Sequence, residues 1–484
     1  MVIIKWINCT HARIDADDGI IKELHEKFSF RPPGWRFSPK YKSGRWDGWI
    51  RLVRLDGKIP TGLVSACMKY LLTVGYKVSL SPEFSTFLTS LPFDEDSLEL
   101  PFPMWDHQVE AVNIALQKKR RVILSPTSSG KTLIAYCIAR TLADAGLKVL
   151  IIVPSVMLVT QLRGDFESFS ELNQWDTNKH LHTITAGDEK QSDASVVAST
   201  WQSLQNITSR EYFAQYDAVI GDEVHGAKAD ELSRILEMCT NAFYRIGMTG
   251  TLDGAASNEM TIEGHFGPQT RVATTADLQE LGHVSNVEIE CHIIKYTDPA
   301  FLEAVRGLNY AGEIGVIVKK KSRNQYISRI VGQYSGNTLI LCRLVEDHVR
   351  PLAALIQAEY PDKKVYTLDA SVKKEDREAI RRLAEIESNL IIIATYDLFS
   401  TGVSIKNLHN VIFAHPMKAS IKILQSIGRT LRLHDSKECA KVIDIADDFR
   451  GKYKKENYAL KHFMIRAGLY TKEKFPIKIV EASI

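Results

Sequence analysis

Continuous apolar runs mark a first long region of the chain, from about residue 100 to 280. They alternate with helical patterns, and they are VILS (122–125), KVLIIVP (148–154), ASVVAST (194–200), YDAVIGDE (216–223) and FYRIGMTG (243–250). Apolar residues that are continuous rather than alternating are typical of a parallel sheet covered on both faces. Strand–helix–strand alternation therefore predicts a doubly wound α/β domain.

A later region repeats the pattern. Its strand-like runs are NTLILC (337–342), KKVYTLD (363–369), NLIIIATY (389–396), NVIFAH (410–415) and AKVIDIAD (440–447). Before both of them, an N-terminal region ends near residue 95, at an acidic stretch (93–99) that has the composition of a linker. The pattern predicts two tandem doubly wound parallel-sheet α/β domains (96–280 and 281–484) after a small N-terminal α/β (α+β) domain (1–95).

Bulk properties narrow the class of protein. A length of 484 residues exceeds one hydrophobic core, and a net charge of +3 is too small to indicate a partner. The seven cysteines are scattered without C-x-x-C spacing, which favours a reducing compartment over a zinc ribbon or a disulfide framework. The N-terminus does not read as a signal peptide, and no apolar run reaches the roughly 18 residues of a membrane helix. We expect a soluble, cytoplasmic protein with no membrane partner.

The stretch from Ser125 to Thr132, SPTSSGKT, fits a phosphate-binding loop except at its first position. Ser125 replaces the glycine of G-x-x-x-x-G-K-[ST], where a small residue suffices if its backbone angles stay in allowed space. Gly130 is needed for close backbone approach, Lys131 reaches the β/γ-phosphates of ATP, and Thr132 ligates Mg²⁺. The alternative is a Ser/Gly-rich turn that caps a core helix.

Two acids end the apolar strand 216–223 in the same domain. Asp222 is suited to hold Mg²⁺ through water, and Glu223 to orient and deprotonate an attacking water. His225 is a candidate sensor of the γ-phosphate, with a capping or surface histidine as the alternative. Two acids after a strand are common, so the argument depends on the phosphate loop lying earlier in the same domain.

The second α/β domain contributes an arginine pair. Arg429 and Arg432 lie three residues apart on one helix face, within the segment QSIGRTLR that begins at Gln425. If the domains face each other, these arginines can meet the γ-phosphate as fingers supplied in cis. A pair of surface arginines is the alternative.

Together these motifs, in this order, resemble those of superfamily 2 DExH-box helicases. The resemblance implies RecA-like folds for both α/β domains. Further matching segments are W-D-H-Q (105–108), V-P-S-V-M-L-V-T-Q (153–161), T-W-Q-S-L (200–204), T-G-T (249–251) and the stretch from A-T-Y (394–396) to S-T-G-V-S (400–404). Ser404 departs from the aspartate that most members place against the ribose.

A narrower resemblance covers nearly the whole chain. The segments RFSPKYK (36–42), GRWDGWIRL (44–52), STGVSIKNLH (400–409) and 424–432 are similar to those of the UvsW family of recombination helicases of T-even phages. This family generally tolerates serine at the position of Ser125.

The resemblance assigns roles residue by residue. It implies catalytic roles for Lys131, Asp222, Glu223, His225, Gln425, Arg429 and Arg432, and nucleotide contacts for Gln108 (adenine), Ser128, Ser129, Gly130, Lys131, Thr132 and Gly402. Thr249, Gly250 and Thr251 would couple hydrolysis to movement, and Thr132 and Asp222 would hold Mg²⁺. The nucleic-acid contacts expected are Thr160, Gln161, Thr200, Gln202, Arg343 and Thr395 in the α/β domains, with Lys42, Arg45 and Trp46 at the N-terminus.

The N-terminal candidates have support from composition. Eight Lys/Arg against two Asp occur between Arg31 and Lys58, interleaved with five aromatic residues. Cations bind phosphates and aromatic rings stack on bases. The alternative, equally weighted, is that the aromatics form a small core and the charges solvate it. A second basic stretch (450–478) predicts a helix on the last domain, with a solvated face favoured over DNA contact.

These features predict an ATP-dependent motor acting on nucleic acid. The family resemblance implies branched DNA, single-stranded DNA and RNA–DNA hybrids as partners, with R-loops, stalled forks and Holliday junctions as substrates. It also implies recombination and single-strand-binding proteins as partners. We expect a monomer, because the sequence has no heptad run that would indicate a coiled-coil dimer. The alternatives are a restriction-type translocase, for which no convincing nuclease motif is present, and an ATP-gated binding module.

Overall fold

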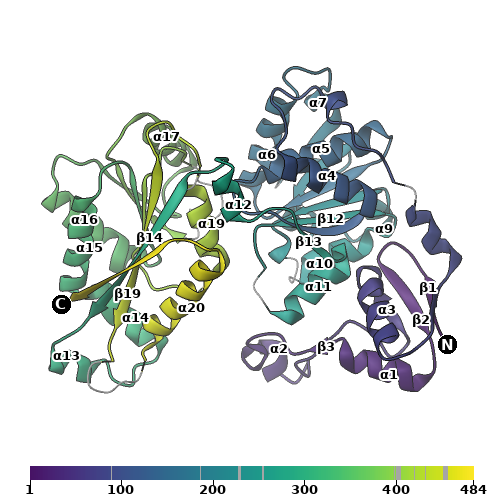
Figure 1. The fold of residues 1–484 in the computed structure, drawn as a ribbon, viewed down its shortest axis with the longest axis horizontal. Helices are drawn as coiled ribbons and strands as arrows, with labels where there is room; N and C mark the ends of the chain where they lie inside the picture. Colours follow the sequence, from purple (N-terminus) through teal and green to yellow (C-terminus); the bar gives the residue numbers. More distant parts are fainter. Residues whose placement is uncertain are drawn as a thin grey trace. The chain divides into compact units, whose positions relative to one another are not determined.

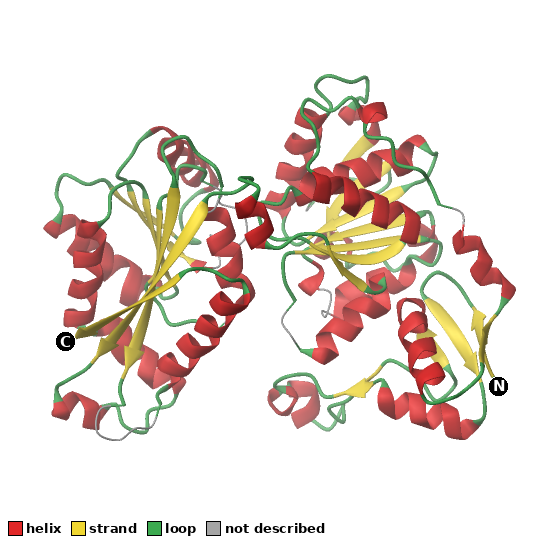
Figure 2. Cartoon of the chain, in the orientation of Figure 1, coloured by secondary structure: helices red, strands yellow, loops and turns green. Residues whose placement is uncertain are grey.

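The structure is a computed structural model of residues 1–484. It describes the chain except residues 89, 186, 227–229, 253–254, 397, 399–404, 419, 431 and 451–455, and a few further side chains. The chain divides into two compact units, residues 1–273 and 274–484, each built on its own seven-stranded sheet. The ribbon in Figure 1 follows the chain through both, and Figure 2 separates helices from strands.

The first unit contains a parallel seven-stranded sheet. Its strands, in order across the sheet, are β13 (Gln269–Arg271), β7 (Arg120–Leu124), β12 (Tyr244–Thr249), β11 (Ala218–Asp222), β8 (Val149–Val153), β10 (Val196–Thr200) and β9 (Leu181–Ile184). All five strands predicted from the apolar runs are confirmed. The pattern missed β9 and β13, which are short strands at the two edges.

Continuous apolar strands arise here because helices cover both faces. Side chains that alternate along β8 enter two separate cores, one on each face. The first core packs against α4 (Asp106–Lys118), α5 (Lys131–Asp144) and α6 (Val156–Phe169). The second packs against α8 (Trp201–Leu204), α9 (Arg210–Ala214), α10 (Asp230–Met238) and α11 (Ala256–Phe266).

The second unit repeats this architecture. Its parallel strands follow the order β16 (Val365–Leu368), β17 (Ile391–Thr395), β15 (Thr338–Cys342), β18 (Asn410–Phe413), β19 (Cys439–Asp448), β14 (Asn286–Lys295) and β20 (Ile477–Ser483). Its helices include α12 (Thr275–Glu280), α13 (Pro299–Ala304), α14 (Tyr310–Lys319), α15 (Lys321–Gln333), α16 (Arg350–Glu359), α17 (Lys374–Ile386), α19 (Ser420–Thr430) and α20 (Tyr458–Lys472). The five predicted strands are confirmed, and β14 and β20 were missed.

The basic C-terminal stretch forms α20, as predicted, but one of its cations is not on a solvated face. Arg466 is buried and makes two hydrogen bonds to Asp444, at 2.8 and 2.7 Å, while Tyr470 donates to the same carboxylate at 2.8 Å. A second buried pair joins Arg323 to Asp447 at 2.7 Å. Such pairs persist in a core because the partners also satisfy each other's hydrogen bonds. Arg466 therefore anchors α20 to its sheet.

The N-terminal residues form a small mixed sheet of order β5 (Lys58–Pro60), β2 (His11–Asp15), β1 (Val2–Trp6) and β6 (Val78–Leu80). Helices α1 (Asp18–Lys27) and α3 (Val64–Thr73) supply its apolar core. This confirms the expected small α/β domain before two RecA-like folds. None of the described helices is long and apolar enough to cross a membrane.

The N-terminal sheet is docked tightly on the first RecA-like fold. The amide of Cys9 donates to the carbonyl of Thr240 at 3.0 Å, and the ring of Trp6 stacks on that of Phe243. Gly62 lies against α11 so closely that an added Cβ would be 2.0 Å from the carbonyl oxygen of Glu263. The two parts therefore belong to one compact unit.

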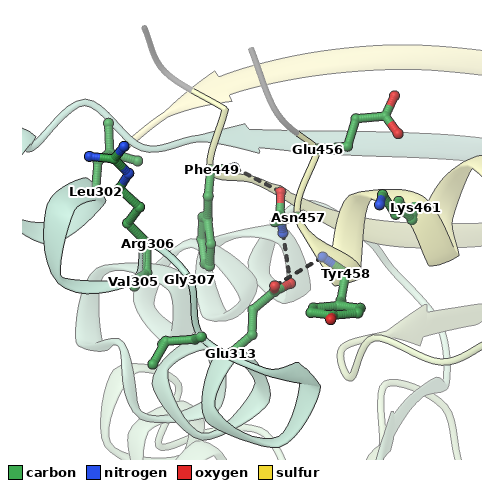
Figure 3. A pocket seen from close by; sticks show the side chains of 11 residues that line it. Leu302, Val305, Arg306, Gly307, Glu313, Phe449, Glu456, Asn457, Tyr458 and Lys461 are labelled. Atoms are coloured by element: carbon green, nitrogen blue, oxygen red, sulfur yellow. Dashed lines mark hydrogen bonds between the residues drawn. The ribbon is translucent and has the colours of Figure 1, made fainter. Parts of the chain in front are cut away.

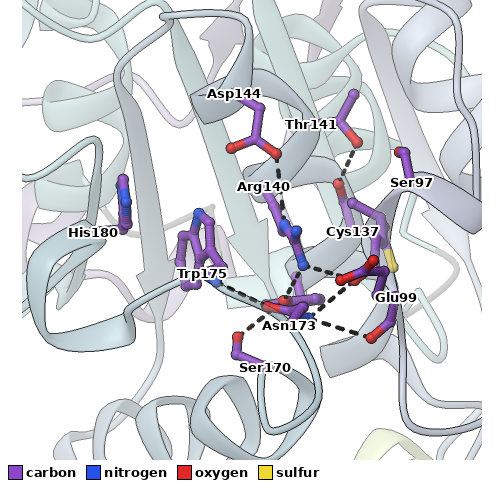
Figure 4. A network of polar contacts seen from close by, with 12 residues as sticks. Ser97, Glu99, Cys137, Arg140, Thr141, Asp144, Ser170, Asn173, Trp175 and His180 are labelled. Atoms are coloured by element: carbon purple, nitrogen blue, oxygen red, sulfur yellow. Dashed lines mark hydrogen bonds and ion pairs between the residues drawn. The ribbon is translucent and has the colours of Figure 1, made fainter.

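The acidic stretch at residues 93–99 is also tied down rather than free. A network of polar contacts, shown in Figure 4, fixes the carbonyl of Leu98. It accepts hydrogen bonds from Arg140 at 2.8 Å and from the side-chain amide of Asn173 at 2.9 Å. Arg140 also donates to the hydroxyl of Tyr136 at 3.0 Å. This segment is thus packed against the first RecA-like fold.

The Gly62 contact generates a stability prediction. We expect Gly62→Ala to lower the free energy of unfolding by about 1–3 kcal/mol, because backbone carbonyls cannot move aside for the methyl group. Gly164→Ala is the matched control, since this exposed helical glycine has nothing within 4 Å and alanine favours a helix by about 1 kcal/mol. Urea unfolding of both variants measures the difference; equal midpoints would contradict the close docking.

Candidate active site

The phosphate loop joins β7 to α5 and is held together by serine hydroxyls. The Ser125 hydroxyl donates to that of Ser129 at 2.6 Å, and the Ser129 hydroxyl donates to the carbonyl of Pro126 at 2.7 Å. Ser125 is fully buried, and its backbone lies outside the left-handed region. A serine therefore fits where the motif usually has glycine, and its hydroxyl adds a tie across the loop.

Gly130 cannot be replaced so easily. It has a φ of +80°, and an added Cβ would lie 2.2 Å from Nε2 of Gln108. Gln108 lies in the first turn of α4; its Nε2 donates to the carbonyl of Ser129 at 2.9 Å, and its Oε1 accepts from the amide of Trp105 at 2.9 Å. His107 contacts the same Ser129 carbonyl at 3.0 Å. The structure thus uses Gln108 to brace the loop, and its role as an adenine reader remains a prediction.

Lys131 begins α5 and points back into the loop. Its ammonium donates to the carbonyls of Ser125 and Pro126 at 3.3 and 3.2 Å. A small cavity of about 30 Å³ is lined by Lys131, Thr132 and Asp222, together with Gln161 of α6. The residues predicted to hold phosphate and Mg²⁺ are therefore neighbours.

The donor set suits a magnesium ion shared with a phosphate. Among the residues that the structure describes, no group of three or more His, Cys, Asp or Glu is placed to hold a metal by itself. A hydroxyl and a carboxylate, here Thr132 and Asp222, are hard oxygen donors, and Mg²⁺ usually completes its shell with waters and substrate phosphates. The arrangement fits that mode of binding.

Asp222 is the last residue of β11 and Glu223 follows it, and the pKa values of these two carboxyl groups shift in opposite directions. Burial of Asp222, followed by the adjacent Glu223 charge, raises its pKa. Burial alone would raise the pKa of Glu223 as well, but the charge of Lys131 and the hydrogen bond with His225 outweigh it and lower that pKa. Glu223 is therefore the firmly ionised member, as a general base requires.

Glu223, His225 and Thr249 meet at one point. The hydroxyl of Thr249 and Nδ1 of His225 each lie 3.2 Å from Oε2 of Glu223, and they are 3.2 Å from each other. Glu223 has a φ of +50°, which is uncommon for a residue with a side chain and recurs at functional sites. Thr249 also reaches the carbonyl of Thr251 at 3.0 Å, and Gly250 lies against the loop at Ser125. The predicted coupling motif thus contacts the predicted base.

The strands that present these residues pack against α11. An added Cβ on Gly221 of β11 would lie 3.0 Å from the ring of Phe266, and one on Gly247 of β12 would lie 3.1 Å from it. The absent side chains let the aromatic ring of α11 lie directly beneath the ends of both strands. Phe266 therefore packs against the two strands close to Asp222 and Thr249.

The predicted nucleic-acid contacts of the first fold divide by exposure. Thr160 and Gln161 on α6 and Gln202 on α8 are exposed, although Gln161 also lines the cavity beside Lys131. Thr200 is 1% exposed, and its hydroxyl caps α8 by accepting from the amide of Ser203 at 3.1 Å. Its side chain is thus engaged in the fold, a result that the motif alone did not indicate.

The candidates of the second unit lie at the carboxyl edge of its sheet or on α19. Arg343 is exposed directly after β15, while Thr395 is buried at the end of β17. Gln425 is half-buried on α19, and Arg432 follows that helix, its carbonyl accepting from the hydroxyl of Ser285 at 3.4 Å. Gly402 and Ser404 and the side chain of Arg429 lie outside the described residues.

The N-terminal aromatics form a cage closed by cations. The guanidinium of Arg31 lies 4.1 Å from the ring centroid of Trp35 and 4.8 Å from that of Trp49. Trp46 donates its indole N–H to the carbonyl of Trp49 at 2.8 Å. Lys42 and Arg45 are exposed on the adjoining segment, and so is Phe37, at 79%. Part of the aromatic set is structural, and the basic residues face outwards.

The second unit also contains a larger hollow of about 460 Å³, between α13 and the start of α20 (Figure 3). Glu313 lies at its base and accepts hydrogen bonds from the amides of Tyr458 and Ala459, at 2.9 and 2.6 Å. It also accepts from the side-chain amide of Asn457 at 2.8 Å. Glu313 therefore caps α20, and its carboxylate is used within the fold.

Comparison with known proteins follows the same division of the chain. Residues 2–81 match the model of the N-terminal domain of DNA helicase UvsW. Residues 101–254 match that of the res subunit of type III restriction enzymes, and residues 322–434 match the helicase conserved C-terminal domain. The ATP-dependent DNA helicase UvsW of Enterobacteria phage T4 is 35% identical over 489 residues, which cover 96% of both chains. The chain belongs to the UvsW family. It is an ATP-dependent DNA helicase of that type.

Solved structures agree with this assignment. The crystal structure of T4 UvsW covers 100% of this UvsW-family chain and 99% of its own, with 31% identity and a TM-score of 0.51. A fragment of a putative HsdR subunit of a type I restriction enzyme from Vibrio vulnificus YJ016 covers 81% of this chain and 71% of its own, with a TM-score of 0.59. At 18% identity, that second likeness shows the shared fold alone.

Sequence reasoning missed two residues at this site. His107 braces the Ser129 carbonyl beside Gln108, and Asp165 of α6 lines the cavity with Lys131. His107 is the residue directly before Gln108 in the matched W-D-H-Q segment, so its position carried a signal. Asp165 lies in an amphipathic helix, where nothing in the sequence separates it from other acids.

Gly130 provides a test of the site. We expect Gly130→Ala to weaken ATP binding at least tenfold, because the methyl group strains the left-handed backbone and displaces Gln108 from the loop. Gly146→Ala is the matched control, since Gly146 has a φ of +79° but nothing within 4 Å. It should cost about 1 kcal/mol of stability and leave ATP affinity unchanged. Equilibrium titration with a fluorescent ATP analogue distinguishes them; equal affinities would refute the close approach as a requirement for binding.

Proposed function

We propose that this helicase remodels branched DNA in phage recombination, repair and replication control. Its substrates are R-loops, stalled forks and Holliday junctions, and it also acts on single-stranded DNA and RNA–DNA hybrids. The observation that carries the proposal is the match to T4 UvsW along the whole chain, N-terminal domain included, at 35% identity. We further infer three domains (1–95, 96–280 and 281–484) and a monomer that works with recombination and single-strand-binding proteins.

In the proposed hydrolytic step, each residue at the ends of the strands has one task. Lys131 and the backbone of Ser128, Ser129 and Gly130 bind the phosphates. Thr132 and Asp222 would hold Mg²⁺, which would supply positive charge to the phosphates. Glu223 accepts the proton of the attacking water, and its lowered pKa means that the carboxylate is ionised beforehand.

The remaining catalytic residues contact either Glu223 or the phosphate that is transferred. His225 and Thr249 contact Glu223, so they can report the state of the base to the Thr249–Gly250–Thr251 segment. We propose that Gln425 orients the terminal phosphate. Arg429 and Arg432 stabilise the charge that develops on the transferred phosphoryl group, as arginine fingers do.

Strand binding is proposed to rest on exposed residues and backbone amides. Thr160, Gln161, Gln202 and Arg343 have side chains suited to phosphate oxygens, which hold a strand without reading bases. Because the side chains of Thr200 and Thr395 are buried, we propose that these two residues contact the strand through their backbone amides. Alternation of these contacts between the two RecA-like folds moves the strand.

The N-terminal segment 36–46 is proposed to hold the branch point. Lys42 and Arg45 contact phosphates, and Phe37, the most exposed aromatic residue of the segment, stacks on an unpaired base. Trp46 contributes through the aromatic cage, since its indole N–H is already bonded to Trp49. Arg36 and Lys40 extend the positive surface.

We expect Lys131→Ala to abolish ATP hydrolysis and leave DNA binding intact, because its ammonium donates to the carbonyls of the phosphate loop and is assigned to the phosphates. The matched control is Lys118→Ala, which removes an exposed lysine at the end of α4 and should hydrolyse ATP normally. A coupled ATPase assay with and without forked DNA measures both. Near-normal turnover in Lys131→Ala would remove the assigned role.

The branched-DNA activity is tested by strand separation. Unwinding of a fork, an R-loop and a four-way junction is compared with that of a linear duplex, for the full chain. We expect all three branched substrates to be resolved faster than the duplex. ATP hydrolysis stimulated by DNA without strand separation would favour the translocase or binding-module alternative.

The N-terminal surface is tested by charge removal. We expect Lys42→Ala/Arg45→Ala to weaken fork binding about tenfold and to reduce the slope of log affinity against log salt by about 2. The control, Lys22→Ala/Lys69→Ala, removes two exposed lysines of the same domain and should change neither value. Fluorescence anisotropy between about 50 and 200 mM salt measures the slope. Equal slopes in the two double variants would place the DNA elsewhere.

A further inference from the structure

A lysine is buried in the second unit, just after the helix that carries the arginine motif. Lys437 is 6% exposed, and its ammonium donates to the carbonyls of Thr430 at 2.6 Å, Leu408 at 3.1 Å and Lys406 at 3.2 Å. An ammonium has three N–H donors and no acceptor, so these carbonyls satisfy it completely. An unpaired buried charge is very costly, so these three hydrogen bonds are needed to keep the ammonium buried.

The three carbonyls belong to two segments with predicted catalytic roles. Thr430 ends α19, the helix of Gln425 and Arg429, and Arg432 follows two residues later. The last carbonyls of a helix lack intrahelical partners and carry partial negative charge, so a cation is favourable there. Lys406 and Leu408 follow the segment that contains Gly402. One ammonium therefore joins the end of the arginine-bearing helix to the preceding loop.

The loop side of this contact is held independently. The carboxylate of Glu385 on α17 accepts from the amides of Lys406 and Asn407, at 2.9 and 3.1 Å. The hydroxyl of Ser436 donates to the side-chain oxygen of Asn407 at 2.9 Å. The loop stays anchored without Lys437, so loss of the ammonium releases mainly the last turn of α19.

We propose that Lys437 is a positioning residue for ATP hydrolysis, which fixes the C-terminal end of α19 so that Arg429 and Arg432 are presented in a defined place. This inference rests on the proposed roles of those two arginines. Because misplacement of a catalytic group by about 1 Å can cost up to a hundredfold in rate, a missing clamp lowers turnover without removing any group that touches ATP.

The charge of Lys437 is open to titration. Burial lowers its pKa to about 8, with Glu385 opposing the shift. Two histidines lie near Lys437: His409, whose pKa is lowered by burial, and His434, whose carbonyl accepts from the amide of Lys437 at 2.9 Å. Above that pKa the neutral amine keeps two N–H donors, so one of the three carbonyls loses its partner. Turnover is therefore expected to fall as the pH rises through about 8.

The first experiment compares Lys437→Met with Lys441→Met in the full chain. Lys441 lies four residues later on β19 and pairs with Glu288, so its loss removes the same charge without touching α19. We expect Lys437→Met to lower DNA-stimulated kcat about tenfold with the KM for ATP unchanged within about twofold. Affinity for ADP–aluminium fluoride, which mimics the phosphoryl group in transfer, should fall by the same factor, and affinity for ADP should not. Lys441→Met should match the wild type in all four values.

A second variant covers the case in which Lys437→Met does not fold. Lys437→Arg stays charged at every accessible pH, so its turnover should persist at pH 9, where that of the wild type has dropped. Adding Lys437→Met to the double variant Arg429→Ala/Arg432→Ala should lower kcat no further, because Lys437 acts through these two arginines.

Three results would overturn the proposal: an unchanged kcat in Lys437→Met, an equal loss of affinity for ADP and for the transition-state mimic, or a further loss of kcat when Lys437→Met is added to Arg429→Ala/Arg432→Ala. The proposed function is tested separately. If Arg429→Ala and Arg432→Ala hydrolyse ATP normally, the arginine assignment fails; if both are inactive while Lys437→Met is normal, only the positioning role fails.

Discussion

The active site depends on three parallel strands that end side by side. The amide of Ser125, after β7, donates to the carbonyl of Thr249, at the end of β12, at 3.1 Å. β11 lies on the other side of β12 and delivers Asp222 and Glu223 to the same edge. Parallel pairing therefore brings together a loop, an acid pair and a threonine that are spread along the chain from Ser125 to Thr249. Everything chemical that we propose for the first unit follows from this shared edge.

Much of this was predictable from the sequence because parallel sheets leave a strong signal. All ten strands predicted from continuous apolar runs exist. Nine of them are mostly buried, whereas β16, an edge strand that pairs only with β17, is mostly half-buried. The missed strands lack that signal for physical reasons. In β20 exposed residues prevail because the strand pairs on one side only, and β14 alternates between buried and exposed positions. β13 has only three residues, and β9 has only two apolar residues, Leu181 and Ile184, so neither forms a continuous apolar run.

The sequence identified which residues belong to the site, but it did not indicate most of their side-chain contacts. Motif spacing indicated Lys131, Asp222 and Thr249, but side-chain engagement depends on tertiary neighbours that spacing does not encode. Thr200 caps a helix, Gln108 braces the loop, and the tryptophans of the N-terminal segment close around Arg31. Lys437 had no sequence signal at all, because a lysine in a polar turn is ordinarily solvated.

The contact between Gly62 and α11 has a mechanical consequence. Gly62 touches the backbone of Glu263 and Gly264, and three residues later the ring of Phe266 supports Gly221 and Gly247. These glycines immediately precede Asp222 and Met248 in the strands of the catalytic edge. The ring of Phe266 and the side chain of Val224 both pack against these two glycines. Force applied to the N-terminal domain is therefore transmitted through α11 to the strands that carry Asp222 and Thr249.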